Sequence, residues 1–309
     1  MQKIKVISVN TSKKKGTIKQ PVGEICINHL GVVDDAHAGM GYRQVSLLAS
    51  ESIARGSLKA GRELNPGLFA ENITTQGFEL YRMKRLDRLV SGNIELMVTQ
   101  IGKKCHSGCE IFKEVGDCVM PKEGIFCKVI EGGKLSPNDI LEYCEKVFDV
   151  RIIALSNQAL KSEYNDLYSE EIKIRVGAFF SDNKRAFTIT KQVICDENDE
   201  LETLIKKYTA YKADIIFITG RTDTEPFEIT TDAIEPLGYK ELPELMEFIH
   251  LNFDAYNPKV AINHSIGGTF EKTLVYCLPA SPKEVLKYMA EIQKTLFHNL
   301  YKINDLDIK

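Results

Sequence analysis

The sequence has no long apolar run, little net charge and few cysteines. No segment reaches the roughly 18 apolar residues that a membrane-spanning helix needs. The first residues, Met1–Ser8, lack the apolar core and cleavage site of a secretory signal peptide. A formal net charge of -3 provides no overall field that would attract nucleic acid. We therefore expect a cytoplasmic protein that binds neither membranes nor nucleic acid.

Cysteine is scarce. Eight cysteines in a chain of 309 residues are too few for a disulfide scaffold. In a chain without an export signal we expect reduced thiols. Buried structural thiols are the default expectation for Cys26, Cys144, Cys195 and Cys277. The other four cysteines gather within residues 105–127, and this segment is the first candidate for chemistry.

The length suits two domains of about 150 residues each. Hydrophobic residues make up 43% of the chain and charged residues 27%, as in ordinary globular proteins. Up to residue 146, short apolar runs alternate with turns, which is typical of β-rich barrels. From about Val150, strand and helix patterns alternate instead. We predict a mainly antiparallel β-barrel over residues 1–146, followed by an α/β domain with a doubly wound parallel sheet over residues 150–309.

Several elements can be assigned from apolar periodicity. In the first domain the pattern predicts a helix over Ala49–Leu58 and strands over Lys3–Asn10, Val22–Asn28 and Ile94–Ile101. In the second it predicts strands over Arg151–Ser156, Phe187–Cys195 and Ala213–Gly220, and helical stripes within residues 201–208 and 285–300. The stretch Tyr164–Phe180 is ambiguous, since its residues alternate as in a strand while its position calls for a helix.

The strand over Ile94–Ile101 ends at Gly102 and leads into a loop with Cys105, His106 and Cys109. Glycine permits the positive φ of a tight turn there. The thiolate is the nucleophilic form of cysteine, and neighbouring cationic side chains lower a cysteine pKa. Lys103, Lys104 and His106 are placed to do so. A zinc knuckle would need a second close cysteine pair, which Cys118 and Cys127 do not form.

A second group of polar residues precedes this loop. Asp34, Asp35 and His37 follow Gly31, and a carboxylate with an imidazole can bind a metal, move a proton or simply cap a loop. The guanidinium fork of Arg43 suits an oxyanion, although an ion pair with Asp34 or Asp35 is an equal alternative. The basic run Lys13–Lys15 is either a solvated turn or a rim that attracts an anionic cofactor.

These motifs together resemble MOSC domains, the fold found in molybdenum-cofactor sulfurases and related proteins. The resemblance rests on stretches that occur in the family's order, namely Gly31–Gly39, Arg43–Leu48, Phe69–Ile73, Val98–Phe112 and Met120–Phe126. Val33 stands where the family usually has glycine. The resemblance covers roughly the first 145 residues.

The MOSC resemblance implies specific roles for the residues that match. Asp35 and His37 match the family's Gly-Asp-x-His, and Glu71 and Asn72 match its Glu-Asn pair, which helps to shape the cofactor pocket. Cys109 takes the position of the family's reactive or metal-facing cysteine, either carrying a persulfide or coordinating molybdenum. Cys105 would then be a resolving partner or a spare, with Lys103, Lys104 and His106 tuning the sulfur.

The second half resembles molybdopterin-binding domains, the fold of molybdopterin adenylyltransferases. The matching residues are Asp166 and Asp196, which follow predicted strands, Thr219-Gly220, Thr230 with Ala233, and Leu278–Pro282. The resemblance implies that this half binds the pterin of the molybdenum cofactor.

The second half also departs from that family. The family's Thr-Gly-Gly-Thr-Gly loop is here Thr219–Asp223, with Arg221 and Asp223 in place of glycines. Glycine-rich loops hold phosphate because their backbone N–H groups approach closely and nothing repels the anion. Asp223 adds negative charge, which argues against adenylyl transfer. Arg221 could instead grip the pterin phosphate, and the half could also serve only for packing or assembly.

The sequence thus predicts a protein of molybdenum-cofactor biosynthesis or handling, with a transferase-type reaction at Cys109. It is too short to include a cysteine desulfurase of the kind fused to other MOSC domains, so a separate desulfurase would supply sulfur and a molybdoenzyme would receive the product. The alternatives are a non-catalytic carrier or insertion chaperone, and a MOSC reductase of hydroxylated nitrogen compounds. A homo-oligomer is compatible with the sequence.

Overall fold

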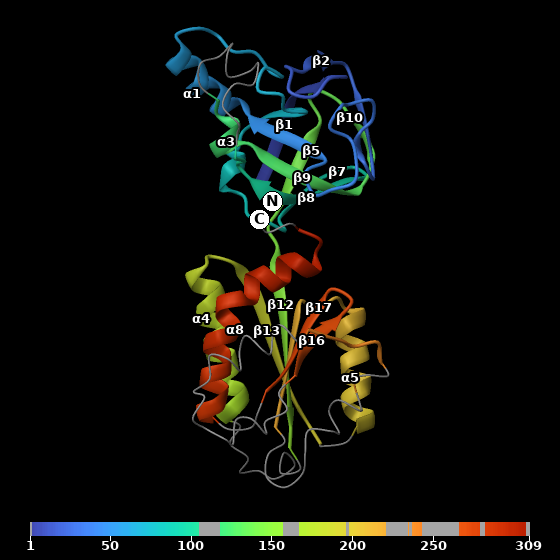
Figure 1. The fold of residues 1–309 in the computed structure, drawn as a ribbon, viewed down its shortest axis with the longest axis vertical. Helices are drawn as coiled ribbons and strands as arrows, with labels where there is room; N and C mark the ends of the chain where they lie inside the picture. Colours follow the sequence, from blue (N-terminus) through green and yellow to red (C-terminus); the bar gives the residue numbers. More distant parts are fainter. Residues whose placement is uncertain are drawn as a thin grey trace. The chain divides into compact units, whose positions relative to one another are not determined.

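The computed structural model describes residues 2–104, 118–156, 167–195, 198–220, 234, 237–242, 266–278 and 282–306. The chain divides into two compact units, Met1–Lys146 and Val147–Lys309 (Figure 1). Each unit has its own sheet and its own core, and each is described here by itself.

The first unit is a β-barrel. Its strands are β1 (Gln2–Thr11), β5 (Val45–Ala49), β6 (Ile73–Gln76), β7 (Arg88–Ser91), β8 (Ile94–Ile101), β9 (Ile125–Glu131) and β11 (Ile140–Cys144), in the order β11-β7-β8-β9-β5-β6-β1. The barrel closes because β1 also pairs with β11, with Gln2 opposite Tyr143. Strands β5 and β6 run parallel, and the other barrel pairs are antiparallel. The prediction of a mainly antiparallel barrel is confirmed.

The barrel core is aliphatic. Side chains such as Ile4, Leu47, Ile73, Leu96 and Leu141 are fully buried in it. They alternate along their strands with residues that face outward, as the pleat of a strand requires. A short strand, β2 (Gln20–Val22), adds to the edge of β1, and a small separate sheet has the order β10 (Gly133–Leu135), β3 (Ile25–Asn28) and β4 (Gly31–Val32).

Helical segments of the first unit lie beside the barrel. They are α1 (Ser50–Ala60), the 3₁₀ turn η1 (Leu80–Arg82) and α3 (Met120–Glu123). A smaller apolar cluster, which includes Ile53, Phe69 and Met120, joins α1 and α3 to the barrel wall. Arg55 of α1 binds Glu79 at 2.8 Å and Glu123 at 2.5 Å, and so links the three segments by charge.

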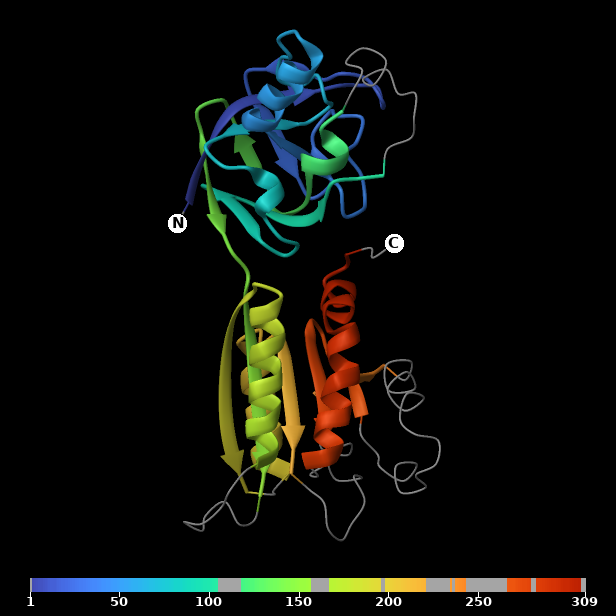
Figure 2. The ribbon, with the colours of Figure 1, turned by 90° about the vertical axis from the view of Figure 1, so that its left-hand side faces the viewer.

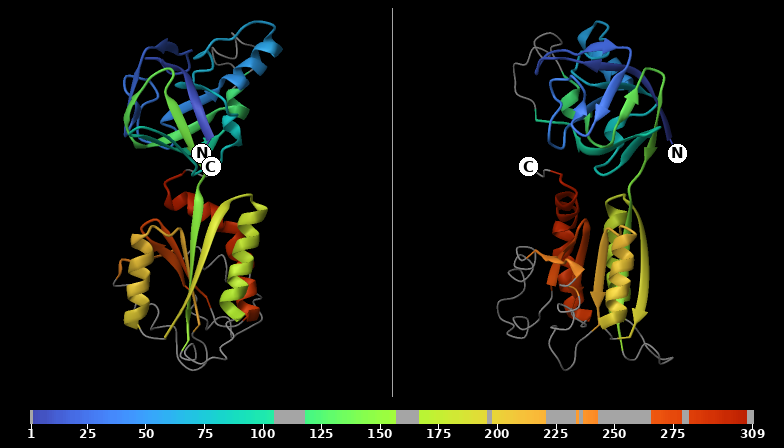
Figure 3. Two further views of the ribbon diagram at one scale, coloured as in Figure 1. Left: turned by 180° about the vertical axis from the view of Figure 1, so that it is seen from behind. Right: turned by 90° about the vertical axis from the view of Figure 1, so that its right-hand side faces the viewer.

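The second unit is a three-layer α/β structure. Its sheet contains β12 (Val147–Leu155), β13 (Ala186–Ile194), β14 (Ile215–Thr219), β15 (Lys240–Glu241), β16 (Ile266–Phe270) and β17 (Thr273–Leu278), in the order β13-β12-β14-β17-β16-β15. Strands β13, β12, β14 and β17 are parallel. Helices α4 (Leu167–Asp182) and α8 (Pro282–Ile303) cover one face, and α5 (Asn198–Ala210) covers the other (Figures 2 and 3). The predicted doubly wound sheet is confirmed.

The sheet differs from a purely parallel one at one side, where β16 runs antiparallel to both β17 and β15. The ambiguous stretch before residue 180 is helical in α4, whose buried residues Ile172, Val176 and Phe180 recur at spacings of four. Helical spacing among the larger apolar residues thus prevails over the short alternating run. Among the described residues, no helix is long and apolar enough to cross a membrane.

Candidate functional site

The loop after β4 is held by a buried ion pair that the sequence reading missed. Lys19 Nζ donates to both carboxylate oxygens of Asp35, at 2.7 and 2.6 Å. The backbone N–H groups of Ser12 and His37 donate to the same carboxylate, each at 3.0 Å. Asp35 therefore pairs with Lys19 and not with Arg43. Lys19 lies a few residues beyond Lys13–Lys15, and nothing in its local sequence marks it as buried.

The electrostatics of the pair follow from burial and contact. Burial alone would raise the pKa of Asp35, but hydrogen bonds from His37 and Lys19 and the lysine charge outweigh it and hold the pKa well below its usual range. Burial lowers the pKa of Lys19, which the carboxylates of Asp35 and Glu71 oppose. The charge of Lys103 also lowers it.

Asp35 fixes the position of His37. Besides the backbone contact, His37 Nδ1 lies 3.4 Å from Asp35 Oδ1, and the imidazole remains 40% exposed. A half-exposed imidazole beside a buried carboxylate can bind a ligand or move a proton. Asp35 and His37, which the sequence predicted to act together, are thus in contact. The side chain of Asp35 is buried, and that of His37 is partly exposed.

Glu71 and Asn72 lie inside the barrel wall. Asn72 Oδ1 accepts the backbone N–H and the hydroxyl of Ser46, at 3.2 and 3.0 Å, which ties β5 to the start of β6. Asn72 Nδ2 donates to the backbone oxygen of Asn10 in β1 at 3.3 Å. Both side chains are buried, with exposed fractions of 0% and 1%. The contacts of Asn72 thus hold β1, β5 and the start of β6 together.

The carboxyl group of Glu71 is only half satisfied. Its Oε1 accepts from Gly67 N at 2.6 Å and from Thr74 Oγ1 at 2.8 Å. Its Oε2 is buried and has no hydrogen-bond partner among the described residues. Burial raises the pKa of Glu71 and outweighs these hydrogen bonds. Gly67 is required here, because its φ is +86° and a Cβ would lie 2.2 Å from the backbone oxygen of Lys19.

Two cations lie near one aromatic ring, that of Phe126 at the start of β9, beside the end of β8. The guanidinium carbon of Arg43 lies 5.9 Å from the ring centroid of Phe126, and Lys103 Nζ lies 5.8 Å from it. Arg43 also lies over Tyr42, at 5.3 Å. Within the described part of the chain neither cation forms an ion pair. Phe126 belongs to the stretch Met120–Phe126 that carries the MOSC resemblance, but the sequence predicted no role for its ring.

The backbone around these cations is fixed locally. Gln44 Nε2 donates to His29 O at 2.7 Å, and its Oε1 accepts from Val129 N at 2.7 Å, so it joins the loop before β5 to β9. Gly102 has the positive φ that the sequence predicted, at +66°. A Cβ there would lie 2.4 Å from the backbone oxygen of Pro121. Gly102 thus directs Lys103 and the exposed Lys104 out of β8.

The predicted reactive residues Cys105, His106 and Cys109 lie outside the described residues. Cys127 and Cys277 are buried, and burial raises the pKa of both thiols. The expectation of a buried Cys26 is wrong, because this residue alternates outward on β3 and is exposed. Cys144 and Cys195 are intermediate in exposure and not fully buried. Among the residues that the structure describes, no group of three His, Cys, Asp or Glu side chains could hold a metal ion.

In the second unit, Thr219 and Gly220 end β14 at the carboxyl edge of the sheet. Gly220 has a φ of +119°, and a Cβ would lie 2.1 Å from the backbone oxygen of Leu155 at the end of β12. Thr219 Oγ1 is buried and has no hydrogen-bond partner within the described ranges. The carboxyl ends of parallel strands are where open α/β sheets bind ligands. Asp166, Asp196 and Arg221, which were predicted to join them, lie outside the described residues.

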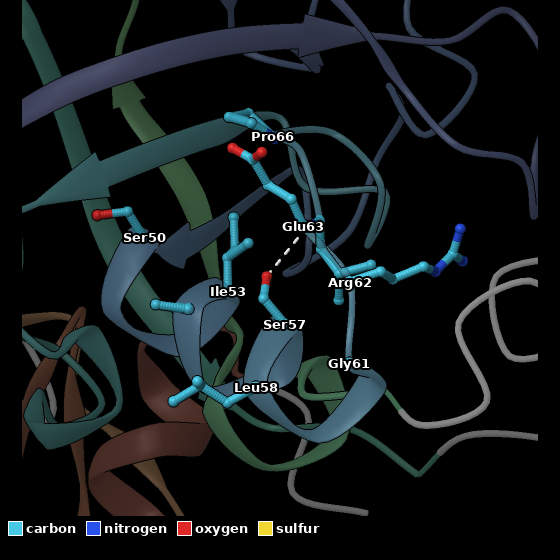
Figure 4. Close-up of a pocket in the computed structure, with 10 residues that line it drawn as sticks. Ser50, Ile53, Ser57, Leu58, Gly61, Arg62, Glu63 and Pro66 are labelled. Atoms are coloured by element: carbon cyan, nitrogen blue, oxygen red, sulfur yellow. Dashed lines mark hydrogen bonds between the residues drawn. The ribbon is translucent and has the colours of Figure 1, made fainter.

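A pocket of about 730 Å³ lies elsewhere on the first unit, between α1 and the following loop (Figure 4). Ile53, Leu58 and Leu64 line it with Arg62 and Glu63. Ser57 Oγ accepts the backbone N–H of Leu64 at 3.0 Å and ties the loop to the helix. None of the residues predicted for the site lines this pocket.

Comparisons with protein families match both units. Residues 34–142 match the MOSC domain, and residues 152–298 match the family described as "Probable molybdopterin binding domain". Molybdopterin adenylyltransferase of Helicobacter pylori strain 26695 is 26% identical over 137 residues, covering 44% of this chain and 76% of the relative. Molybdenum cofactor biosynthesis protein B of Staphylococcus aureus strain Mu50 is 26% identical over 116 residues, covering 36% and 69%.

Solved structures similar to parts of this chain include the following two. MoaB of Thermus thermophilus, titled a molybdopterin biosynthesis enzyme, has 23% identity and a TM-score of 0.45, covering 51% of this chain and 96% of its own. YiiM of Geobacillus stearothermophilus has 22% identity and a TM-score of 0.38, covering 46% and 75%.

Proposed function

We propose that both units bind the molybdenum cofactor and that the first unit transfers sulfur to it. The chain carries a MOSC domain followed by a molybdopterin-binding domain. A role in the biosynthesis or handling of this cofactor follows from the two family matches and from the named relatives. The sulfur step and the residues that carry it are the proposal.

The observation that carries the proposal is the pair of cations at Phe126. Arg43 and Lys103 lie near one ring, and the charge of Lys103 also lowers the pKa of the buried Lys19. Like charges gathered without a carboxylate partner in the described ranges favour an anionic ligand. The phosphate of a pterin cofactor supplies that charge. Arg43 would bind it by its fork, Lys103 as a point charge, and His37 would lie beside it, held by Asp35.

The proposed sulfur step uses Cys109. Its thiolate attacks the outer sulfur of a persulfide on a separate donor protein such as a cysteine desulfurase, the donor's sulfur–sulfur bond breaks, and the donor cysteine leaves as a thiolate. Cys109 then holds the persulfide for delivery to the cofactor of a recipient molybdoenzyme. Lys104 and His106 would lower the pKa of Cys109, with Cys105 as the resolving thiol. Direct coordination of molybdenum by Cys109 is the second form of the same proposal.

For the second unit we propose pterin binding without adenylyl transfer. Thr219 and Gly220 stand at the carboxyl edge of the sheet, where Asp166, Asp196 and Arg221 would join them. Arg221 and Asp223 replace the glycines of the related adenylyltransferases. The protein should therefore not adenylylate molybdopterin with Mg-ATP. Turnover at the rate of a glycine-loop adenylyltransferase would contradict this.

The alternative is a non-catalytic carrier or insertion chaperone, in which both units bind cofactor and no bond forms. Mass spectrometry after incubation with a cysteine desulfurase and cysteine separates the two. Sulfur transfer predicts a gain of one sulfur on Cys109, which is absent from a Cys109→Ser variant. A carrier predicts bound pterin and no persulfide on any cysteine. Protein that contains neither pterin nor molybdenum after expression with molybdate would contradict both.

A further inference from the structure

The segment between β1 and β2 contains a turn, residues 12–17, that carries the three consecutive lysines Lys13, Lys14 and Lys15 (Figure 1). All three side chains of this lysine turn are exposed, and within the described ranges none of them forms an ion pair. A merely solvated turn would account for exposed lysines, but it would not require a fixed backbone beneath them. Here the backbone is fixed, and it is bonded to the loop of the candidate site.

Hydroxyl groups hold the lysine turn in one conformation. Ser12 Oγ and Thr17 Oγ1 form a hydrogen bond with each other at 2.8 Å. Ser12 Oγ also accepts the backbone N–H of Lys14 at 3.2 Å, and Thr17 Oγ1 donates to the backbone oxygen of Lys14 at 2.8 Å. Both backbone groups of Lys14 are thus bound within the turn. The lysine side chains extend from a preformed backbone, which lowers the conformational entropy lost when a partner docks.

The lysine turn is bonded to the loop of the candidate site. Ala36 N donates to Ser12 O at 2.8 Å, and Ser12 N donates to Asp35 Oδ2 at 3.0 Å. The carboxylate of Asp35 does not neutralise the turn, because it is paired with the buried Lys19. Asp34 is the exposed carboxylate of that loop, and among the described residues it forms no ion pair with the turn. Three unneutralised positive charges therefore lie beside the candidate site.

The chemistry of the lysine turn favours an acidic protein surface as its partner. In the proposed site the phosphate of the pterin is already matched by Arg43 and Lys103, so three further exposed cations exceed what the cofactor needs. Lysines on flexible stems act as point charges, which suits a broad acidic surface. Residues 12–17 include no aromatic or large apolar side chain on which nucleic-acid bases would stack or that would enter a lipid surface. The net charge of -3 also disfavours nucleic acid.

We propose that the lysine turn docks an acidic surface of the protein that delivers sulfur to the first unit. This inference rests on the sulfur transfer proposed above, and it adds where the donor binds and which charge its surface carries. Complementary charge raises the rate of encounter and fixes the orientation of the partners more than it adds affinity. Because the turn is bonded to Asp35 and Ala36, a donor docked there lies beside the candidate site.

Binding of a fluorescent peptide of glutamates to the full chain tests the surface without any chemistry. Fluorescence anisotropy should show binding that weakens with added salt, because the contacts are between exposed charges. Lys13→Gln with Lys15→Gln should weaken binding by about fivefold or more at low salt. The matched control is Lys3→Gln with Lys5→Gln, which removes the same charge from exposed lysines about 20 Å from the end of β1. Circular dichroism of both variants should match. Equal weakening by both variants, or tighter binding to duplex DNA or to phosphatidylserine vesicles than to the peptide, would overturn the proposal.

Persulfide loading separates this inference from the proposed function. With the source organism's cysteine desulfurase and cysteine at low salt, the variant of Lys13 and Lys15 should load Cys109 more slowly than the control variant, by about fivefold or more. Cysteine persulfide, a small donor with no protein surface, should load both variants at one rate. Equal rates from the desulfurase would overturn the docking surface while sulfur transfer stands. If neither donor loads the unsubstituted chain, sulfur transfer fails, and docking of a sulfur donor fails with it, whatever the peptide binds.

Discussion

Lys19 and Asp35 form an ion pair that is almost wholly removed from water, with side-chain exposures of 1% and 2%. Burying two charges is costly, and the cost is met here by two bonds from Lys19 and two backbone N–H groups on Asp35. The pair joins the chain before β2 to the loop after β4. The pair therefore fixes the loop that carries His37.

Removing one partner of this pair should destabilise the first unit. Asp35→Asn leaves the Lys19 charge buried, and we expect a loss of about 3–5 kcal/mol in the free energy of unfolding. Asp34→Asn is the control, since Asp34 is exposed beside it, and should change stability by about 0.5 kcal/mol or less. Urea unfolding measures both. Equal effects would show that the ion pair does not hold the loop.

The same carboxyl group should dominate acid unfolding. The folded-state pKa of Asp35 is lowered, so its contribution is present above its unfolded pKa of about 3.9 and is lost as pH falls toward the folded value. Stability measured from pH 6 to pH 2 should therefore fall less steeply in Asp35→Asn than in the unsubstituted protein. Parallel curves would contradict the lowered pKa.

Glu71 should have the opposite pH dependence. Burial raises its folded-state pKa, so ionisation opposes folding, and stability is lost as pH rises from the unfolded pKa of about 4.3 through the folded value. Glu71→Gln retains an acceptor for Gly67 N and Thr74 Oγ1 and cannot ionise. We expect this variant to lose less stability than the unsubstituted protein between pH 5 and pH 8. A steeper loss would mean that the charged form is the stabilising one.

Arg43 should matter for ligand binding and little for stability. It is exposed and, among the described residues, makes only ring contacts. Arg43→Ala should lower the pterin recovered per chain and weaken binding by about 1.5–3 kcal/mol, the range for a hydrogen bond to a charged group. Arg43→Lys keeps the positive charge but lacks the guanidinium fork, so its affinity for pterin should lie between those of the unsubstituted protein and Arg43→Ala. Arg82→Ala, at an exposed arginine paired with Glu79, should bind normally. Unchanged pterin binding in Arg43→Ala would exclude the cations at Phe126 as the binding site.

Cys109 should be the fastest cysteine to alkylate at neutral pH. Its sequence neighbours Lys103, Lys104 and His106 favour the thiolate. Cys127 and Cys277 should label last, because burial raises their pKa values and limits access. Cys26 is the informative control, since it is exposed but lacks the cationic loop. Peptide mass spectrometry after a short pulse of iodoacetamide would show the order, and a faster Cys26 would contradict the proposed site.

The two units should fold independently when the chain is divided between them. A polypeptide that ends at Glu145 retains the barrel strands and their aliphatic core. We expect it to remain monodisperse and to have a mainly β circular dichroism spectrum. The remainder from Val147, where β12 begins, should show the mixed spectrum of an α/β domain. Aggregation of the first part, or a largely helical spectrum, would contradict the predicted boundary.

The periodicity of apolar residues was sufficient to predict the architecture, but it predicted less of the candidate site. The stripe from Val285 to Leu300 and the run Ile215–Thr219 each predict their element, because the pattern of burial sets the pattern of sequence. The pairing of Asp35 with His37 was also accessible. The contacts of Lys19 and of the Phe126 ring were not, since they involve residues far along the chain. Cys26 shows the converse error, because its residue type favours burial while its place on β3 faces outward.

The closure of the barrel has a consequence for synthesis on the ribosome. β1 emerges before the other strands of this unit, yet its residues Gln2 to Lys5 pair with Tyr143 to Ile140 of β11, the last strand of the unit. The edge of β1 that pairs with β11 therefore stays unpaired until nearly the whole first unit has been translated. Contacts so distant in sequence slow folding and leave an unpaired edge available for wrong partners. Nascent chains arrested before residue 140 should accordingly depend most on chaperones.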